Sequence, residues 1–240
     1  MKFFLSKNGI EYYYTDKFLY AKKKNSKDGS GQAELYKLAL FDRRFYKLRL
    51  YNRVPILEID GLRMQLVRDF KSPLDYSKEI ASRLRIGKND AVLDTCMGLG
   101  YTAIAAAKYA QRVITCEISN AVLQLAKWNP FSSDLFSVSV NIEIKQGDIA
   151  SLIAGMKEKS FDAVIHDPPR FSLAPQLYSS QFYQELFRVC KKGARLFHYV
   201  GSLGKERGRN IENEVGRRLE AVGFRQIKFE PRFQGLFFIK

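Results

Sequence analysis

Carboxylates and glycines stand at the ends of successive apolar segments in the middle of this 240-residue chain. Asp94 closes one such segment and is followed by Gly98 and Gly100, while Glu117 closes the next. Glycine lets the backbone approach a ligand closely, and a carboxylate at the second strand end is placed to bind two ribose hydroxyls. A carboxylate before the glycines suits an ammonium group and would repel a pyrophosphate. These residues therefore predict a site for a nucleoside that carries an amino acid.

A third carboxylate supports the same prediction. Asp148, followed by Ile149, offers an acceptor for an adenine amino group beside an apolar face. Each carboxylate alone is as readily explained as a helix cap, because acidic residues often cap helices at strand ends. The two glycines alone also fit a dinucleotide-binding turn. The three acidic residues taken together with the glycines favour the nucleoside.

A second candidate segment reads His-Asp-Pro-Pro-Arg-Phe over residues 166–171. The adjacent prolines Pro168 and Pro169 hold their carbonyl groups in a stiff, extended turn. Asp167 and these carbonyls can therefore orient a substrate, and Arg170 can stack on a base or bind a phosphate. The segment predicts an acceptor site in which Asp167 orients the reacting group and takes its proton.

Histidines, tyrosines and cysteines are weaker candidates. His166 and His198 could transfer protons near neutral pH, but both fall on expected strands, where a hydrogen-bonded core histidine is the commoner explanation. The tyrosines at 12–14 could stack on bases, although a small sheet needs such rings for its own core. Cys116 and Cys190 are expected to be structural. Because the cysteines and histidines lack any metal-ligand spacing, no metal site is expected.

The elements that would position these residues alternate between strands and helices from residue 91 onward. We expect strands at 91–93, 113–116, 140–144, 161–165 and 195–200, and helices at 101–111, 121–128, 151–156, 176–189 and 211–222. Such alternation predicts a parallel sheet with helices on both faces. The tail at 224–229 and 233–239 is expected to form an antiparallel hairpin. The predicted fold class is therefore α/β, with a doubly wound, seven-stranded, mostly parallel sheet.

The first 70 residues follow a different pattern. Short aromatic and β-branched runs are separated by Asn8-Gly9 and Asp60-Gly61, which are typical of hairpin turns. A basic loop rich in glycine and serine is expected at 22–31, and a helix capped by Ser72 is expected over 72–86. We therefore divide the chain into a small β-rich region at 1–70, a candidate for substrate binding, and a larger domain at 71–240.

The composition favours a soluble, folded protein with an anionic partner. Apolar residues make up 46% and charged residues 27%, which excludes a disordered chain. No apolar run is long enough to span a membrane or form a signal-peptide core, so a cytoplasmic protein is expected. Of the net charge of +15, residues 1–90 contribute +9, 91–190 contribute −1 and 191–240 contribute +7. Such basic flanks favour nucleic acid as a partner, and general solubility is the alternative.

The order of these motifs over residues 72–240 resembles that of the class I S-adenosylmethionine-dependent methyltransferases. The resemblance implies S-adenosylmethionine as cofactor, with its methionine moiety near Asp94 and the glycines, its ribose on Glu117 and its adenine beside Asp148. The family usually has a glycine where this chain has Cys96. By this resemblance the cofactor-binding residues are Asp94, Cys96, Gly98, Gly100, Tyr101, Thr102, Glu117, Ile118, Asp148, Ile149 and Asp167.

The Asp-Pro-Pro-Arg-Phe segment is similar to motifs of nucleic-acid methyltransferases. In the family, Asp-Pro-Pro followed by an aromatic residue marks transfer to an exocyclic amino nitrogen, but Arg170 stands in the aromatic position here. The segment also resembles Asp-Pro-Pro-Lys-Phe of ribosomal RNA cytosine-C5 methyltransferases. Those enzymes need a cysteine after the fifth strand, which this chain lacks at 197–202. The resemblance implies that the catalytic residues are Asp167, Pro168, Pro169 and Arg170.

Other functions remain open at this point. Residues 177–186 resemble the helix that follows the catalytic loop of spermidine synthases, which share this fold and use decarboxylated S-adenosylmethionine. Those enzymes hold a polyamine with several carboxylates, whereas Asp167 is the only acidic residue between Asp162 and Glu185. The sequence favours a methyltransferase acting on RNA, with an aminopropyltransferase, a non-catalytic RNA-binding protein and an NAD oxidoreductase as alternatives. It leaves open the methylated atom and the oligomeric state.

Overall fold

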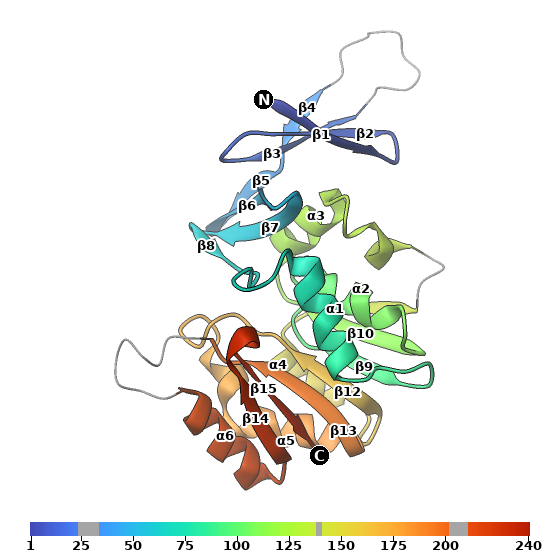
Figure 1. Cartoon of the computed structure of the whole chain (residues 1–240), viewed down its shortest axis with the longest axis vertical. Coiled ribbons are helices and arrows are strands. Elements are labelled where there is room, and N and C mark those ends of the chain that lie inside the picture. Colours follow the sequence, from blue (N-terminus) through green and yellow to red (C-terminus); the bar gives the residue numbers. More distant parts are fainter. Residues whose placement is uncertain (24–33, 138–140, 202–210) are drawn as a thin grey trace.

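A computed structural model gives the fold of the chain and describes residues 1–23, 34–137, 141–201 and 211–240. A seven-stranded sheet forms its centre (Figure 1). The strands are β9 (Ala91–Asp94), β10 (Arg112–Glu117), β11 (Ile142–Gln146), β12 (Phe161–His166), β13 (Cys190–Tyr199), β14 (Arg225–Glu230) and β15 (Gly235–Ile239). Their spatial order is β11-β10-β9-β12-β13-β15-β14. The first five strands are parallel and the closing hairpin is antiparallel, so the predicted fold class is confirmed.

Six α-helices cover the two faces of this sheet in the described part of the chain. One apolar cluster packs α1 (Pro73–Arg83), α2 (Tyr101–Ala107) and α3 (Asn120–Trp128) on one face. Another packs α4 (Ile149–Leu152), α5 (Ser180–Val189) and α6 (Ile211–Val222) on the opposite face. Because side chains alternate along a strand, Val92 enters the first cluster and Leu93 enters the second. Single turns of 3-10 helix are η1 (Ser133–Phe136), η2 (Ile153–Gly155), η3 (Pro175–Tyr178) and η4 (Pro231–Phe233).

Several element boundaries differ from the expected ones for local reasons. Ser72 caps α1 as predicted, but the helix ends at Arg83. The helix expected over 176–189 is divided, since the Ser179 hydroxyl accepts a hydrogen bond from the Phe182 amide and starts α5 there. The strand expected at 195–200 begins earlier than predicted, because Cys190 is already the first residue of β13.

The β-rich region at the start of the chain consists of two antiparallel sheets of four strands. These strands are β1 (Lys2–Lys7), β2 (Ile10–Tyr14), β3 (Leu19–Lys23), β4 (Leu35–Lys37), β5 (Ala39–Asp42), β6 (Arg44–Tyr51), β7 (Val54–Ile59) and β8 (Leu62–Arg63). Tyr12 is buried in this region, as a core residue would be. Most of the loop expected at 22–31 lies outside the described residues.

The β-rich region packs against α3 and the turn that follows it. Its buried side chains belong to the same apolar cluster as those of α1, α2 and α3. Lys7 Nζ donates hydrogen bonds to the Pro130 carbonyl at 2.6 Å and to Ser133 Oγ at 2.8 Å. The rings of Tyr36 and Trp128 lie 5.5 Å apart between centroids. The contacts therefore hold this region in a defined position over the sheet.

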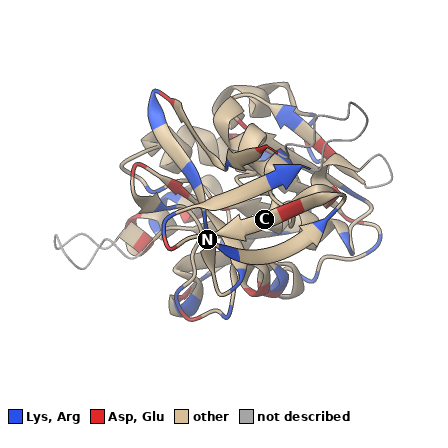
Figure 2. Cartoon of the chain, turned by 90° about the horizontal axis from the view of Figure 1, so that it is seen from above, with Lys and Arg blue, Asp and Glu red and all other residues tan. Residues whose placement is uncertain are grey.

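Charged residues are spread over several sides of the molecule. Figure 2 shows lysines and arginines on many elements, with aspartates and glutamates between them. The two basic flanks lie largely apart, since β1–β4 and the β14–α6 end occupy opposite ends of the long axis (Figure 1). They meet where Arg232 donates hydrogen bonds to the Asp69 carbonyl and to the Glu79 carboxylate. The overall charge therefore does not form one continuous basic track in the described residues.

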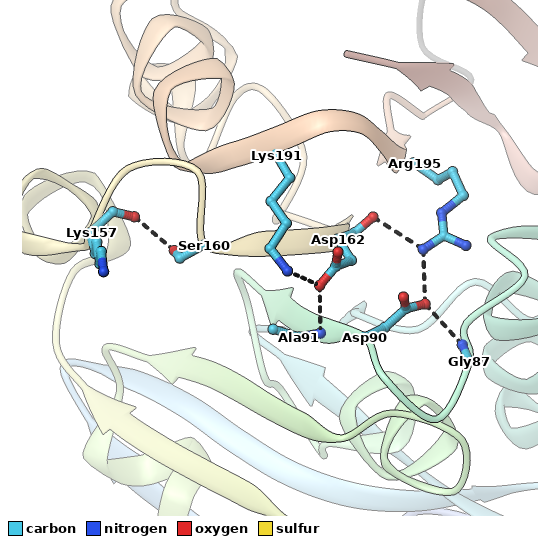
Figure 3. A network of polar contacts seen from close by, with 8 residues as sticks. All are labelled: Gly87, Asp90, Ala91, Lys157, Ser160, Asp162, Lys191 and Arg195. Atoms are coloured by element: carbon cyan, nitrogen blue, oxygen red, sulfur yellow. Dashed lines mark hydrogen bonds and ion pairs between the residues drawn. The ribbon is translucent and has the colours of Figure 1, made fainter.

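A polar network ties together the amino ends of the central strands (Figure 3). Asp162 Oδ2 accepts a hydrogen bond from the Ala91 amide at 2.9 Å and pairs with Lys191 Nζ at 2.7 Å. Arg195 Nη2 pairs with Asp90 Oδ2 at 2.8 Å and also donates to the Asp162 carbonyl. The network joins β9, β12 and β13 at the sheet edge opposite the predicted site, so its role is to hold the strands in register.

We expect Arg195→Met to lower the free energy of unfolding by about 1–3 kcal/mol, because it removes charge-assisted hydrogen bonds to partly buried acceptors. Urea denaturation measures this change. The matched control is Lys157→Met, which also removes one positive charge. Only the backbone carbonyl of Lys157 takes part in the contacts of Figure 3, so this variant should keep the wild-type midpoint. Equal midpoints for both variants would show that the network contributes nothing.

Candidate active site

The loop that follows β9 takes a left-handed backbone conformation, which glycine adopts most readily, at two positions. Gly98 and Gly100 have positive φ angles of 54° and 76°. A Cβ atom at Gly100 would overlap the side chain of Leu135. The Met97 amide donates to the Cys116 carbonyl at 2.7 Å, and the Gly100 amide donates to the Met97 carbonyl at 2.7 Å. The loop therefore lies tightly against the end of β10 before α2 begins at Tyr101.

The side chain of Asp94 fixes the two ends of this loop through hydrogen bonds. Its side chain is fully buried and accepts hydrogen bonds from Thr115 Oγ1 at 2.6 Å and from Thr102 Oγ1 at 3.0 Å. Burial raises the pKa of Asp94 to about 7, although both hydroxyls favour its charged form. In this structure the carboxylate thus links β9 to β10 and to the first turn of α2.

Glu117 lies at the end of β10 and faces the same loop. Its carboxylate accepts hydrogen bonds from the Gly98 amide at 3.0 Å and from the Ser119 amide at 2.9 Å. Burial raises the pKa of Glu117, while these backbone donors act in the opposite direction. Ile118, the next residue, exposes 65% of its surface beside it. The end of β10 therefore offers a carboxylate and an exposed apolar side chain together.

Asp148 and Ile149 lie one strand further out, after β11. Asp148 caps α4 by accepting a hydrogen bond from the Ala150 amide at 2.9 Å, and Ile149 is buried. Neither residue lines the cavity beside Gly98 and Glu117, and Asp94 and Gly100 do not line it either. The contact made by Asp148 in this structure is the helix cap that the sequence left open as its alternative explanation.

The Asp-Pro-Pro segment follows β12, next to β9 in the sheet. The Tyr178 hydroxyl donates to the Pro169 carbonyl at 2.9 Å, and the Leu173 amide donates to the Arg170 carbonyl at 2.8 Å, which fixes the turn. Burial raises the pKa of Asp167 to about 7, and the nearby Tyr76 hydroxyl acts to lower it. Arg170 and Phe171 are exposed. The segment presents its carboxyl group inward and its arginine outward.

A cavity of about 270 Å³ lies between these strand ends and the β-rich region, and we call it the first cavity. The predicted residues that line it are Cys96, Gly98, Tyr101, Thr102, Glu117, Ile118, Asp167, Pro168 and Pro169. Its opposite wall comes from α1 and from the β-rich region, including Arg44, Tyr46, Leu57, Ile59, Met64, Gln65 and Tyr76. The sequence did not predict that second wall, because nothing local in 1–70 indicates which face meets the glycine loop.

A second cavity of about 270 Å³ lies on the other side of the two prolines. It shares Met64, Gln65, Pro168 and Pro169 with the first cavity. Its remaining described lining residues are Arg63, Leu66, Val67, Arg68, Arg170, Phe171, Tyr199, Val200, Gly201, Ile211 and Gln234. A larger hollow of about 1040 Å³ lies between α6 and β14, away from every predicted site residue.

Sequence reasoning also missed a buried polar chain that connects the glycine loop to the β-rich region. Asn129 Nδ2 donates to the Tyr101 hydroxyl at 2.8 Å, and that hydroxyl donates to the Pro55 carbonyl at 2.7 Å. Ser132 Oγ donates to the Leu99 carbonyl at 2.6 Å. Asn129 follows α3, where the sequence predicts only a helix end and a turn. Its burial to 1% exposure is what reveals the additional role.

The two histidines form a buried pair behind the Asp-Pro-Pro segment, with ring centroids 4.3 Å apart. His166 Nδ1 lies 2.7 Å from Thr95 Oγ1, and its Nε2 lies 3.0 Å from the Leu177 carbonyl, to which it must donate. His198 Nε2 lies 2.9 Å from the Tyr183 hydroxyl. Burial lowers the pKa of His166 to about 3 and that of His198 well below its usual value. Both rings are therefore neutral core groups near pH 7.

Comparison with known proteins identifies the type of domain. Residues 92–193 match the family model described as a methyltransferase domain. The chain is 44% identical over 215 residues to the uncharacterized protein MJ1233 of Methanocaldococcus jannaschii, covering 89% of this chain and 72% of that protein, and belongs to the same family. The chain is a class I S-adenosylmethionine-dependent methyltransferase.

Two further similarities concern parts of the methyltransferase. The 23S rRNA (uracil(1939)-C(5))-methyltransferase RlmD of Pseudomonas entomophila is 27% identical over 139 residues, which is 56% of this chain and 28% of RlmD. A spermidine synthase in complex with the transition-state analogue AdoDATO has a TM-score of 0.66 at 17% identity. That match covers 88% of this chain and 76% of the synthase, so the shared fold includes much of the β-rich region.

The first cavity fits the cofactor of the methyltransferase. S-adenosylmethionine carries a positive sulfonium and an ammonium group, and the carboxyl groups of Glu117 and Asp167 line the cavity. Arg44 is the only basic residue among the described ones that line it. Burial without a nearby positive charge raises the pKa of Asp167, so a bound cation would lower that pKa. The described residues contain no cluster suited to a metal ion, and no described helix has the length and apolar character of a membrane span.

Buried neutral His166 should make stability depend on pH. The unfolded chain binds a proton on this residue below about pH 6.5, whereas the folded chain does so only near pH 3, so its contribution is lost as pH falls. Relative to His166→Gln, which keeps a donor for the Leu177 carbonyl, the wild type should lose about 2 kcal/mol of unfolding free energy between pH 7.5 and pH 5. Urea titrations at both pH values measure the difference. A difference that does not change with pH would contradict the prediction.

Cofactor binding should release protons. Asp167 has a pKa of about 7 in the free protein, and a cation in the first cavity favours its charged form. The affinity for S-adenosylmethionine should therefore rise about three- to tenfold between pH 6 and pH 8. Calorimetry in two buffers of different ionisation enthalpy counts the protons released. Asp167→Asn should lower that count, and an unchanged count in this variant would remove Asp167 from the linkage.

Proposed function

We propose that this methyltransferase transfers a methyl group to RNA. The observation that supports the proposal most strongly is the second cavity, which adjoins the first across Pro168 and Pro169. Arg63, Arg68 and Arg170 line it, and no carboxylate lines it within the described residues. A site of this charge next to the cofactor favours an anionic acceptor.

The arginines of the second cavity are available for phosphates. Arg68 makes an exposed ion pair with Asp69 at 3.7 Å, and such a pair contributes little. Arg63 and Arg170 have no ion pair with a described carboxylate. Arginine binds phosphate through two parallel hydrogen bonds, and phosphate contacts position a nucleic acid without selecting its sequence.

Aromatic faces accompany these charges. Phe171 exposes 40% of its surface at the second cavity, and Tyr199 lines the same cavity beside it. Bases of single-stranded RNA that are turned out of the stack bind on such rings. Phosphate-binding arginines and stacking rings together describe a nucleotide rather than a simple anion. The name of RlmD, a methyltransferase of 23S rRNA, agrees with this choice of substrate.

In this proposal the predicted residues divide into two sets. Asp94, Cys96, Gly98, Gly100, Tyr101, Thr102, Glu117, Ile118, Asp148, Ile149 and Asp167 hold or shape the cofactor site. Asp167, Pro168, Pro169 and Arg170 form the acceptor site, where Asp167 orients the reacting group and Arg170 binds a phosphate or a base. When bound, S-adenosylmethionine supplies the methyl group, and the contribution of these residues is mainly orientation.

Aminopropyl transfer is the alternative that the fold favours, because a spermidine synthase has a similar structure. A polyamine is a polycation, however, and would meet three arginines in the second cavity. The first cavity offers two carboxyl groups, Glu117 and Asp167, and Glu117 already accepts hydrogen bonds from two backbone amides. The charge of the acceptor site therefore favours RNA over a polyamine.

Methyl transfer from labelled S-adenosylmethionine into separated RNA, protein and small-molecule fractions tests the substrate. We expect label in RNA. Transfer of an aminopropyl group from the decarboxylated cofactor to an amine, without label in RNA, would establish the alternative. Tight RNA binding without calorimetric binding of S-adenosylmethionine would indicate a protein that binds RNA without catalysis.

Arg63→Ala and Arg170→Ala should each raise the KM for RNA about tenfold, because one phosphate contact is worth about 1–2 kcal/mol at moderate salt. The calorimetric Kd for S-adenosylmethionine should stay within twofold of the wild-type value. Arg112→Ala, an exposed residue at the start of β10, is the matched control and should leave both constants unchanged. An equal effect of all three variants would mean that general charge rather than the second cavity binds RNA.

A further inference from the structure

Tyr76 on α1 is a buried polar residue that the proposed roles do not include. It is 3% exposed, and its hydroxyl makes no hydrogen bond to any residue that the structure describes. It lines the first cavity together with Asp167, Pro168 and Pro169. A buried hydroxyl without a partner is destabilising, because it has lost its hydrogen bonds to water without replacing them. We therefore expect a ligand group to bind this oxygen, next to the acceptor site at 167–170.

The ring of Tyr76 cannot easily turn to find another partner. It packs edge-on against Phe70, with centroids 5.1 Å apart, and against Phe197 at 6.2 Å. Phe233 lies 6.0 Å away in a tilted arrangement. Three aromatic neighbours from the end of the β-rich region, β13 and η4 thus fix the ring. The hydroxyl is held in place before any substrate arrives.

Asp167 is the charged group with the largest effect on the pKa of this hydroxyl. Burial of the hydroxyl, and after it the charge of Asp167, raise the pKa of Tyr76 well above 10, so the hydroxyl stays protonated at neutral pH. In the other direction, the Tyr76 hydroxyl lowers the pKa of Asp167 by acting as a hydrogen-bond donor toward it, although the two groups do not reach full hydrogen-bond geometry. The two side chains therefore present two oxygen atoms to the same part of the first cavity.

We propose that Tyr76 and Asp167 together bind the acceptor as an amino group, with one N–H donating to the Asp167 carboxylate and the other to the Tyr76 hydroxyl oxygen. This inference rests on the proposed function and specifies its reacting atom. Two fixed acceptors match an NH₂ group, whereas a ribose hydroxyl has one proton to donate and a ring carbon has no comparable donor.

Methyl transfer to this amino group needs no residue other than Asp167 and Tyr76 at the acceptor nitrogen. The nitrogen lone pair forms the new bond to the methyl carbon, and the methyl–sulfur bond breaks with its electron pair remaining on sulfur. The methylated nitrogen then carries a positive charge and loses one proton to the Asp167 carboxylate. Tyr76 keeps its own proton throughout and acts as a positioning residue at the substrate.

The cysteine in the cavity does not favour carbon chemistry. Cys96 is the only cysteine among the described residues that line the first cavity. Burial and the surrounding carboxylates raise the pKa of its thiol well above the usual value. Because the thiolate is the nucleophilic form, this thiol is a poor nucleophile near pH 7. Covalent activation of a ring carbon therefore has no suitable group here.

Tyr76→Phe removes the hydroxyl and keeps the packed ring, so we expect a kcat for RNA that is 10- to 100-fold lower with an unchanged Kd for S-adenosylmethionine. Because the hydroxyl lowers the pKa of Asp167, its loss should move the acidic limb of the kcat/KM profile to higher pH. Carbon NMR of the labelled Asp167 carboxyl group should report the same upward shift without turnover. A kcat within twofold of wild type, or no shift of the carboxyl titration, would overturn the role of Tyr76.

The matched control is Tyr183→Phe, which removes a buried hydroxyl that is bonded to His198 on the opposite face of the sheet. Tyr183→Phe should lower the urea midpoint and keep the wild-type kcat. Tyr76→Phe should lower kcat and should not lower the urea midpoint.

Mass analysis of nucleosides from the methylated RNA distinguishes the proposed RNA substrate from the proposed amino acceptor. An N-methylated base supports both, and a methylated carbon or ribose overturns the amino acceptor while leaving RNA as substrate. RNA without any label would overturn the proposed function, and the carboxyl titration would still test the pairing of Tyr76 with Asp167.

Discussion

The buried carboxylate of Asp94 is the interaction on which the geometry of the site depends. It accepts hydrogen bonds from Thr115 on β10 and Thr102 on α2, so that one side chain joins the two sides of the glycine loop. Burying a carboxylate is costly unless it is hydrogen-bonded, and the pKa of about 7 reflects that cost. The loop, the end of β10 and the start of α2 are therefore constrained as one unit. Glu117 then completes this unit through the Gly98 amide.

The β-rich region depends on the same unit. The Tyr101 hydroxyl at the start of α2 donates to the Pro55 carbonyl in β7, and Asn129 supports it from the other side. The second wall of the first cavity is therefore attached to the first residue after the glycine loop. Asp167 is buried beside this wall, and burial strengthens its electrostatic interaction with a bound charge. The spermidine synthase match over 88% of the chain indicates that the combination of the sheet with much of the β-rich region belongs to the shared fold.

The sequence allowed prediction of those features that have a local signal. The alternation of strands and helices, the residues at strand ends and the Asp-Pro-Pro turn are encoded over a few neighbouring positions. Tyr76, Gln65 and Asn129 could not be recognised in this way. Asn129 acts through Tyr101, 28 positions away in the chain, and Tyr76 and Gln65 face the glycine loop and Asp167 across a cavity. Asp148 shows the reverse limit, because a helix cap and a ligand contact have the same local pattern. The early start of β13 at Cys190 was not predicted, because the run Cys-Lys-Lys-Gly has no alternation that would predict a strand.

The division of charge within the site is more informative than the charge of the chain. The net charge of −1 for residues 91–190 conceals an inward-facing set of carboxyl groups and an outward-facing Arg170. Two adjacent prolines separate them, so the cavity with Glu117 and Asp167 borders directly on the cavity with three arginines. In the proposed function, attraction between unlike charges would direct a sulfonium cofactor to one side and a phosphate-bearing acceptor to the other. Because Pro168 and Pro169 belong to both cavities, the two ligands would meet at the Asp167 carboxyl group, where the proton of the reacting group must be taken up.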